Sequence, residues 1–270
     1  MNKINLRANI AFAKLEFHNA SIYRISFWLR FIFVFILMYS MGYVWRALYA
    51  ANPAQMGVGL YEIITYTILG IALDSVFAMG AGGPQQYIMD QVRKGAIELD
   101  ILKPMDFQVY MLAKHIGYLS IQLFLVVFPS LVFAYFFFGL GLPTFVGGVT
   151  FLVSLVLACI INFFLKFILG IISMLTMNIQ NIMFGFNATQ RFFSGQVVPL
   201  WLFPGILGTI SLYLPFRGIY AIPISLYIGR YTYSQIWEVL GIQLLWILIL
   251  LLASRMLMSY VFRRLMVQGG

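Results

Sequence analysis

Four polar residues recur at helical spacing within an apolar stretch of the sequence: Asn187, Gln190, Arg191 and Ser194. They occupy positions i, i+3, i+4 and i+7, which place their side chains on one face of an α-helix. Polar groups surrounded by apolar residues need hydrogen-bond partners or water. In a membrane helix such a face is expected to line a transport path, a cavity or a subunit interface. The alternative is a face that only forms hydrogen bonds to neighbouring helices.

Two isolated charges, Asp74 and Lys166, lie within other apolar stretches. A lone charge at the centre of a membrane helix costs ~2.5–3.5 kcal/mol on insertion scales. We therefore predict that these two residues can pair inside the membrane. A structural ion pair is preferred to a substrate site or an ion site.

The sequence lacks the patterns of common catalytic and metal centres. A single cysteine, Cys159, and two distant histidines, His18 and His115, exclude a disulfide framework and a multi-ligand Cys/His site. None of the patterns HExxH, GxSxG and GxxxxGK[ST] occurs. We predict no catalytic residue, no metal ligand and no cofactor-binding residue in this chain, and no hydrolysis of ATP by it.

Composition indicates a polytopic membrane protein. The chain has 270 residues, of which 62% are hydrophobic and 9% are charged, whereas soluble domains are ~45–50% apolar and ~25% charged. The formal net charge of +9 then fits basic cytoplasmic loops and anionic lipid headgroups. Membrane lipids are expected partners, and nucleic acid is not.

The hydropathy pattern predicts an all-α fold that forms one transmembrane domain over residues 1–270. Residues 1–24 have the amphipathic pattern of a helix that lies in the membrane interface. Leu200–Leu214 is apolar and bracketed by prolines, but at ~15 residues it is too short to cross, so residues 199–215 are predicted to be a re-entrant segment on the outer side. The six predicted spans are Ser26–Tyr49, Tyr61–Met79, Val109–Phe138, Phe145–Met174, Ile182–Val198 and Ile236–Phe262.

Basic residues near the span ends predict the orientation. Six spans put both termini on the same side of the membrane. With cytoplasmic termini, twelve basic residues near the span ends lie inside and three, Arg46, Arg217 and Arg230, lie outside. This asymmetry favours cytoplasmic termini.

The loop between the second and third spans, residues 80–108, carries an unusual number of charges. Gln85–Arg93 is predicted to be helical, Gly95 ends that helix, and Lys103-Pro104 turns the chain back towards the membrane. Such a loop can dock a soluble partner. The alternative, a merely solvated connector, has equal weight on the loop's composition alone.

Two motifs resemble the permeases of the type-two exporter superfamily of ABC transporters. The run Gln91-Val-Arg-Lys-Gly-Ala-Ile-Glu-Leu-Asp-Ile-Leu-Lys-Pro104 is similar to their R-x-G-x-[ILV]-x-x-x-L-L-[RK]-P loop, with Ile-Leu-Lys-Pro where Leu-Leu-Arg-Pro is more usual. Phe193-Ser-Gly-Gln-Val-Val-Pro-Leu-Trp-Leu-Phe-Pro204, followed by Leu214-Pro-Phe216, is similar to their S-G-x-x-x-P-x-x-x-[FM]-P … L-P-[FL] segment. The resemblance extends over essentially the whole chain.

The resemblance implies a small permease of the bacterial inner membrane that binds a separate ATP-binding cassette subunit, which holds the ATP and Mg²⁺. A second permease completes the pore and is expected to be a different chain, so the assembly would be a heterodimer of permeases. The residues that would couple to the ATPase lie on and after the predicted helix, with Tyr87 and Ile88 as apolar groups that fill a groove of the partner: Gln86, Tyr87, Ile88, Asp90, Arg93 and Lys94.

The expected function is therefore export of an amphipathic or hydrophobic molecule, such as a drug, a peptide antibiotic, a lipid or a glycan. An ion-coupled secondary transporter is the alternative. It would need an ion-binding cluster and usually internal repeats, and the sequence offers only the two isolated charges Asp74 and Lys166. A membrane enzyme ranks last, because no catalytic constellation is present.

Overall fold

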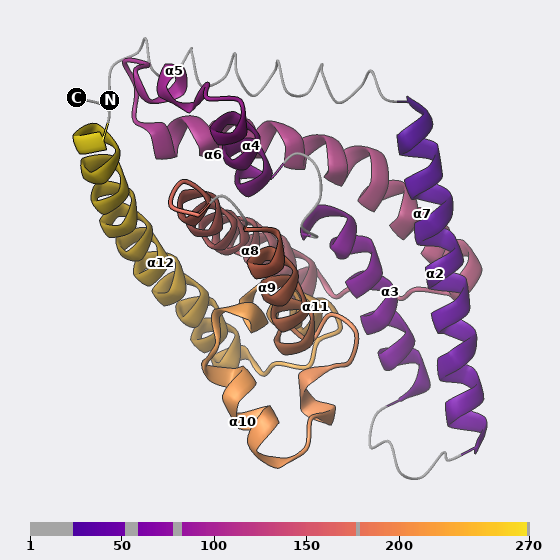
Figure 1. Ribbon diagram of the computed structural model, residues 1–270. Coiled ribbons are helices and arrows are strands. Elements are labelled where there is room, and N and C mark those ends of the chain that lie inside the picture. The colour runs from indigo at the N-terminus through magenta and orange to yellow at the C-terminus, as the bar shows by residue number, and fades with distance from the viewer. Residues whose placement is uncertain (1–23, 52–58, 78–82, 177–178, 269–270) are drawn as a thin grey trace.

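The computed structural model describes residues 24–51, 59–77, 83–176 and 179–268, and every regular element within them is a helix (Figure 1). The surface helix predicted for residues 1–24 falls almost wholly outside the described residues. Five of the described helical segments are long and apolar enough to cross a membrane. The predicted all-α polytopic membrane fold is thus confirmed.

These five segments agree closely with the first, second, third, fourth and sixth predicted spans. The third span joins two α-helices through a short π-helix. The bounds are α2 (Arg24–Ala51), α3 (Leu60–Phe77), α6 (Phe107–Gln122) with η1 (Leu123–Val127) and α7 (Phe128–Phe138), α8 (Phe145–Ser173) and α12 (Tyr233–Gln268).

The π-helix η1 has a local cause in the sequence. Pro129 follows it, in the first turn of α7. Proline has no backbone N–H, and its ring clashes with the carbonyl four residues earlier, so a regular α-helical turn is disfavoured at this point. A wider turn relieves that clash. The helix then continues to Phe138 and ends at Gly139, whose φ of +66° suits only glycine well.

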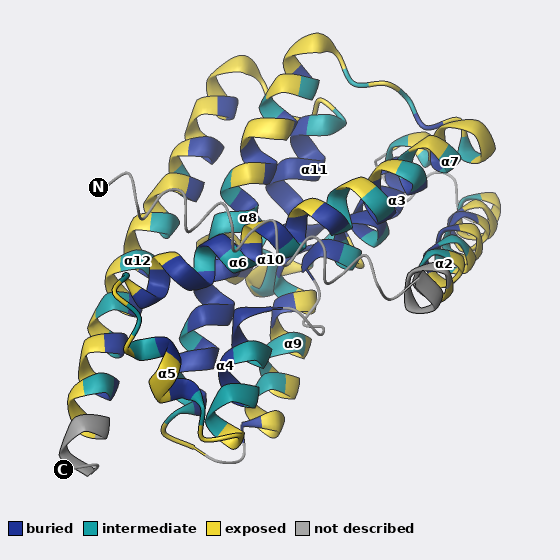
Figure 2. Cartoon of the chain, turned by 90° about the horizontal axis from the view of Figure 1, so that it is seen from above, coloured by how far each residue is buried: buried dark blue, intermediate teal, exposed yellow. Residues whose placement is uncertain are grey.

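Helix α8 is the centre of the molecule. It packs against α4, α11 and α12, and in its C-terminal half every residue from Ile161 to Phe167 is buried. Figure 2 shows the buried residues gathered on α8, α3 and α11, whereas exposed residues lie mainly on the outer sides of α12, α2 and α7. Helices such as α2 and α12, with exposed apolar faces, fit a lipid environment.

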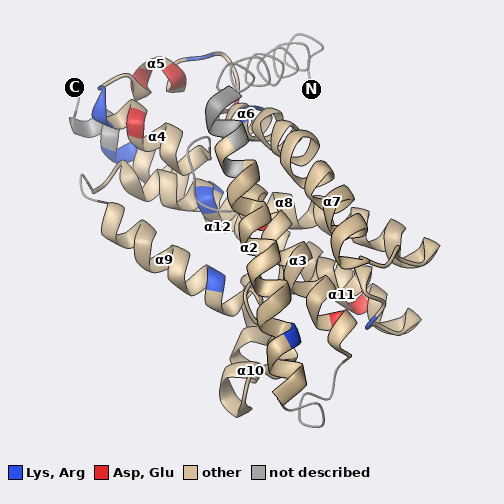
Figure 3. Ribbon diagram, turned by 90° about the vertical axis from the view of Figure 1, so that its right-hand side faces the viewer, with Lys and Arg blue, Asp and Glu red and all other residues tan. Residues whose placement is uncertain are grey.

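Two short helices, α4 (Pro84–Arg93) and α5 (Ile97–Ile101), lie together at one end of the molecule (Figure 1). The prediction of a helix over Gln85–Arg93 is confirmed. Its start is set by Pro84 at the first helical turn, and Gly95, with φ +65°, follows its end. Figure 3 shows that charged residues concentrate at this same end.

The predicted fifth span is wrong in length. Instead of Ile182–Val198 the structure has α9 (Gln180–Phe193), a helix of 14 residues, which is about 21 Å long and shorter than the ~30 Å hydrocarbon core. The chain leaves the helix after Ser194, because Gly195 adopts φ +75° and Pro199 follows.

The segment after α9 bends more extensively than predicted. A short helix η2 (Leu200–Leu202) leads into α10 (Gly205–Tyr213), and η3 (Pro215–Gly218) with α11 (Ala221–Tyr227) forms a second arm. The two arms meet at an angle of 70°, the shape of a broken span or a re-entrant loop. The predicted range of 199–215 covers the first arm alone. Entry of this segment from the outer side stays a prediction.

Candidate functional site

Helix α4 is anchored on α8 by a close approach of the two backbones. Ile88 is fully buried, and a Cβ atom added at Gly170 would lie 2.7 Å from Ile88 Cδ1 and 3.1 Å from Gln85 Cα. Glycine at position 170 therefore makes the contact possible. The prediction that Ile88 fills a groove of a partner is wrong, because this side chain packs into the chain's own α8.

Four polar residues on and just after α4 are exposed or partly exposed, as predicted, whereas Gln85 is buried. Gln86 Nε2 donates to Asp90 Oδ1 at 3.1 Å, one turn along the helix, and both side chains are partly exposed. Arg93 and Lys94 are exposed at the end of the helix. These four groups are thus available to a partner, and their role in coupling stays a prediction.

A buried carboxylate, Asp100, ties α5 to α4 and to the segment that leads into α6. Tyr87 donates its hydroxyl hydrogen to Asp100 Oδ2 at 2.7 Å, and Lys103 Nζ lies 2.6 Å from Asp100 Oδ1. Lys103 Nζ also donates to the Tyr110 hydroxyl at 2.9 Å. Lys114 Nζ lies 3.5 Å from the centre of the Tyr87 ring, within the range of a cation–π contact. We call Tyr87, Asp100, Lys103, Tyr110 and Lys114 the Asp100 cluster.

The protonation of this cluster follows from its surroundings. Burial raises the pKa of the Tyr87 hydroxyl, and the negative charge of Asp100 raises it further, so Tyr87 stays a neutral donor. Partial burial lowers the pKa of Lys103, but its hydrogen bonds to Asp100 and Tyr110 outweigh this effect and hold the pKa above its ordinary value. Tyr87 therefore stays a hydrogen-bond donor to Asp100, and Lys103 keeps its positive charge, around neutral pH.

A second tie joins the start of α6 to α12. The Asp106 carboxylate caps α6 by accepting a hydrogen bond from the backbone N–H of Val109 at 3.0 Å. The same carboxylate pairs with Arg255 of α12. Burial raises the pKa of Asp106, but the hydrogen bonds from Arg255 and from the Val109 backbone N–H outweigh this and leave the pKa below its ordinary value.

Two exposed leucines at the end of the molecule formed by α4 and α5 were not identified from the sequence as candidate contact residues. Leu99 on α5 and Leu102 just after it are 70% and 79% exposed, although both belong to the charged loop. Exposed single leucines are ordinary on a protein surface. Here, however, both belong to the same short stretch of chain as the exposed charges of Arg93, Lys94 and Glu98, and interfaces commonly combine exposed apolar and charged groups. Leu102 falls on the second leucine position of the resembling loop motif, which was the available signal, whereas Leu99 falls on a variable position of that motif.

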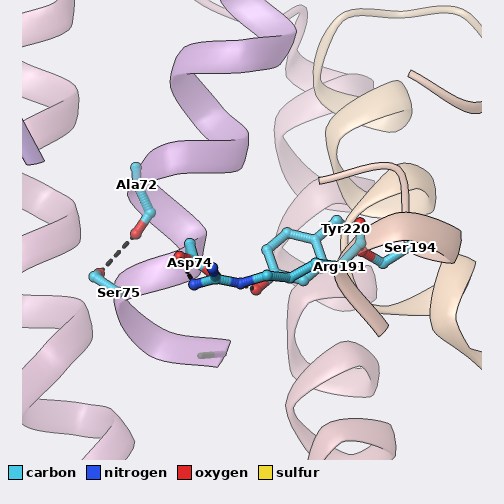
Figure 4. A network of polar contacts seen from close by, with 6 residues as sticks. All are labelled: Ala72, Asp74, Ser75, Arg191, Ser194 and Tyr220. Carbon is cyan, nitrogen blue, oxygen red and sulfur yellow. Dashed lines mark hydrogen bonds and ion pairs between the residues drawn. The ribbon is translucent and has the colours of Figure 1, made fainter. Parts of the chain in front are cut away.

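The third notable cluster joins α3, α9 and η3–α11 (Figure 4). Arg191 Nη2 lies 3.1 Å from Asp74 Oδ2, and Tyr220 donates its hydroxyl hydrogen to Asp74 Oδ1 at 3.0 Å. Arg191 is therefore a charged partner of Asp74 that the sequence did not predict, because α9 brings it to the side of α3. Lys166 is fully buried on α8 and also attracts Asp74 electrostatically, so the predicted pairing of these two residues stays a prediction.

The four polar residues of α9 separate into two pairs. Gln190 and Ser194 are buried, and Gln190 Nε2 lies 3.5 Å from Asn162 Oδ1 on α8. Asn187 is partly exposed and the Arg191 side chain is 56% exposed. Gln190 therefore agrees with the alternative interpretation, in which this face only forms hydrogen bonds to a neighbouring helix. Asn187 and Arg191 are the two of the four that are accessible at the surface.

The turn of the backbone at Ser194 and Gly195, where α9 ends, is explained by its packing. Tyr66 of α3 donates its hydroxyl hydrogen to the Gly195 carbonyl at 2.6 Å, and the Ala221 backbone N–H donates to the Ser194 carbonyl at 3.1 Å. A Cβ atom at Gly195 would lie 2.8 Å from the Tyr66 hydroxyl. A glycine with positive φ is thus required where α9 ends against α3 and α11.

Comparison with known proteins supports the resemblance of the motifs. A search of curated proteins gave no match. Across the described ranges, no group of three or more His, Cys, Asp and Glu residues is placed to hold a metal ion. The model of the ABC-2 family transporter proteins matches residues 33–269. With that match over most of its length and with its apolar membrane helices, the chain belongs to the ABC-2 family, the membrane permeases of ABC transporters.

Proposed function

We propose that this chain is the permease subunit of an ATP-binding cassette exporter for an amphipathic or hydrophobic molecule, such as a drug, a peptide antibiotic, a lipid or a glycan. A separate ATPase subunit binds the ATP and Mg²⁺ and docks on α4 and α5. The observation that carries this proposal is the Asp100 cluster, which connects an exposed, mixed apolar and charged surface to the spans.

The docking surface consists of Arg93, Lys94, Glu98, Leu99 and Leu102. The two leucines supply apolar area that is lost from water on docking, and the charges on either side orient the partner. This surface replaces the role that we had expected of Ile88. The partly exposed Gln86 and Asp90 extend it along α4.

Motion of this surface can reach three spans. Ile88 packs α4 on α8. The Asp100 cluster ties α5 to α6 through Lys103 and Tyr110, and it ties α4 to α6 through the contact of Tyr87 with Lys114. The pair of Asp106 and Arg255 joins the start of α6 to α12. Because packed helices transmit displacement rather than absorb it, closure of two ATPase subunits would shift α6, α8 and α12 together.

The transport path lies along the outer face of α9 beside α3. An ion pair facing hydrocarbon is costly, yet the Arg191 side chain is 56% exposed and that of its partner Asp74 is 23% exposed. Either water or a second permease therefore has to cover this face. Phe184 and Phe192 on α9 are also strongly exposed, which suits contact with a second permease, expected to be a different chain. Asn187 and Arg191 would then line the path.

Export from the cytoplasm of a bacterial cell across its inner membrane follows if both termini are cytoplasmic, as the distribution of basic residues predicts. In that orientation α4 and α5 face the cytoplasm, where ATPase subunits reside. The bent segment α10–α11 would then lie at the outer side.

A reconstituted system tests the proposal. We expect that the chain, purified together with its ATPase and the second permease, transports substrate in lipid vesicles only with ATP. Leu102→Asp should release the ATPase from the complex, because it places a charge in the apolar centre of the docking surface. Leu142→Asp is the matched control: Leu142 is 78% exposed but lies beyond the 32-residue third span.

Two results would contradict the proposal. One is equal retention of the ATPase by both variants. The other is uptake or release of substrate by the chain alone under an ion gradient, which would support the secondary transporter instead.

A further inference from the structure

A pocket of about 520 Å³ lies between η2, α10, α11 and the start of α12. It is at the end of the molecule opposite α4 and α5, where Figure 1 shows α10 projecting from the bundle. Its size falls within the ~300–1,000 Å³ of small-ligand sites. Neither the docking surface nor the α3–α9 face includes it.

The polar wall of the pocket has two arginines in different states. Arg230 is already neutralised, since its Nη1 lies 2.6 Å from Glu62 Oε1, and its guanidinium lies 3.9 Å from the Trp201 ring centre. Arg217 is half-buried, and no acidic side chain or hydrogen-bond acceptor of the described residues pairs with it. None of the residues that line the pocket is acidic. The pocket therefore keeps one uncompensated positive charge.

Two buried donors at the pocket lack an acceptor within the described part of the chain: Arg217 Nε and Trp201 Nε1. Both groups can only donate hydrogen bonds. A buried donor without a partner costs ~1–3 kcal/mol, so a molecule that brings acceptor oxygens would be favoured here. Together with the single uncompensated charge, this indicates a ligand group with one negative charge, such as a phosphodiester or a carboxylate.

Besides the arginines and other polar groups such as Thr209, Ser225 and Gln235, part of the wall is apolar. Phe203, Leu212 and Ile222 line the pocket, and α10 exposes Ile206 and Tyr213 on its outer side. A fully water-soluble anion would leave this apolar area unused. An amphiphile would place its charged group on Arg217 and its chain along α10.

We propose that this pocket binds the singly charged anionic headgroup of a membrane amphiphile, and that Arg217 is the charge-pairing group. The proposal needs no ATPase and no substrate transport, so it can fail or hold independently of the proposed function.

The test uses the full chain in nanodiscs of phosphatidylcholine that contain a small fraction of phosphatidylglycerol, whose headgroup is a singly charged phosphodiester. Native mass spectrometry then measures the lipids that stay bound. We expect preferential retention of phosphatidylglycerol, and a loss in apparent affinity of roughly tenfold or more in Arg217→Gln, as for a charged hydrogen bond. Arg46→Gln is the matched control, because Arg46 is an exposed arginine on α2 that does not line the pocket.

Further arms make each outcome decisive. Thr209→Trp fills the pocket without changing its charge and should also release the lipid. If Arg217→Gln unfolds, the binding measurement on Thr209→Trp tests whether the pocket holds the lipid. Equal retention by wild type, Arg217→Gln and Thr209→Trp would overturn the proposal, and so would equal retention of phosphatidylcholine. Inorganic phosphate at the same concentration should not displace the lipid. If it does, the site binds free anions and the amphiphile is excluded.

Discussion

Gly170→Ala should lift α4 from α8 without altering any polar group. The added Cβ would lie 2.7 Å from Ile88 Cδ1, whereas an ordinary contact is at least 3.4 Å, and it would lie 3.1 Å from Gln85 Cα, a backbone atom. Ile88 is fully buried, so its side chain has little room to yield. Helix α4 must then move outwards by several tenths of an ångström.

The expected magnitude follows from a matched control, Gly241→Ala. Gly241 lies in α12, and an added Cβ would meet no atom within 4 Å. The gain in helix propensity on replacing glycine, ~1 kcal/mol, is common to both variants, whereas overpacking costs ~1–3 kcal/mol. The free energy of unfolding of Gly170→Ala should therefore be about 1–3 kcal/mol below that of Gly241→Ala. In the reconstituted complex, Gly170→Ala should hydrolyse ATP with less substrate moved per ATP.

A second substitution tests the geometric cause. Ile88→Val removes Cδ1, the atom closest to the added Cβ, and alone costs ~0.5–1.5 kcal/mol. Combined with Gly170→Ala it should cost less than the sum of the two single changes, because the 2.7 Å contact is gone. Thermal unfolding of the four proteins measures this coupling. Strict additivity, or identical behaviour of Gly170→Ala and Gly241→Ala, would refute the role of Gly170.

Two other predictions concern charges. Asp74→Asn should lower the midpoint of thermal unfolding, because Arg191 loses its anionic partner, and adding Arg191→Gln should recover part of that loss; a double variant less stable than Asp74→Asn would argue against the pair. Asp106 has a pKa lowered below its ordinary value of 3.8, so its pairing with Arg255 stabilises the folded state above that pH, and the contribution disappears as the pH falls through the lowered value. Thermal unfolding followed through acid pH should show a smaller loss of stability in Asp106→Asn than in wild type, and parallel curves would contradict this.

Local sequence signals were sufficient for most elements of the fold. The long apolar segments predicted the five spans, since each needs only ~20 apolar residues to be recognised. Helix α4 was predicted because Gly95 marks its end. The exposure of its charged side chains was also predicted correctly.

Features that depend on distant residues were beyond the sequence. The burial of Ile88 depends on Gly170, which lies on another helix, and amphipathic spacing cannot tell a partner's groove from the chain's own α8. The pairing of Asp74 with Arg191 depends on how α9 approaches α3, and the sequence could not rank Arg191 against Lys166, the two cations within the predicted spans. The length of α9 was misjudged because apolar residues continue past Gly195, whose backbone turns away to meet Tyr66.

The π-helical turn at Leu123–Val127 has a consequence for the neighbours of the third span. Before it, α6 contacts α4, α8 and α3; after it, α7 contacts α2 and α3. A single residue turns an α-helix by ~100°, so the surplus residue of the wide turn decides which way the second half faces. Shortening that turn by one residue would rotate Phe133 away from Phe35 of α2, with which it makes an edge-to-face contact. The wide turn thus sets the orientation in which the same span packs against α4 and α8 with its first half and against α2 with its second half, while α3 contacts both halves.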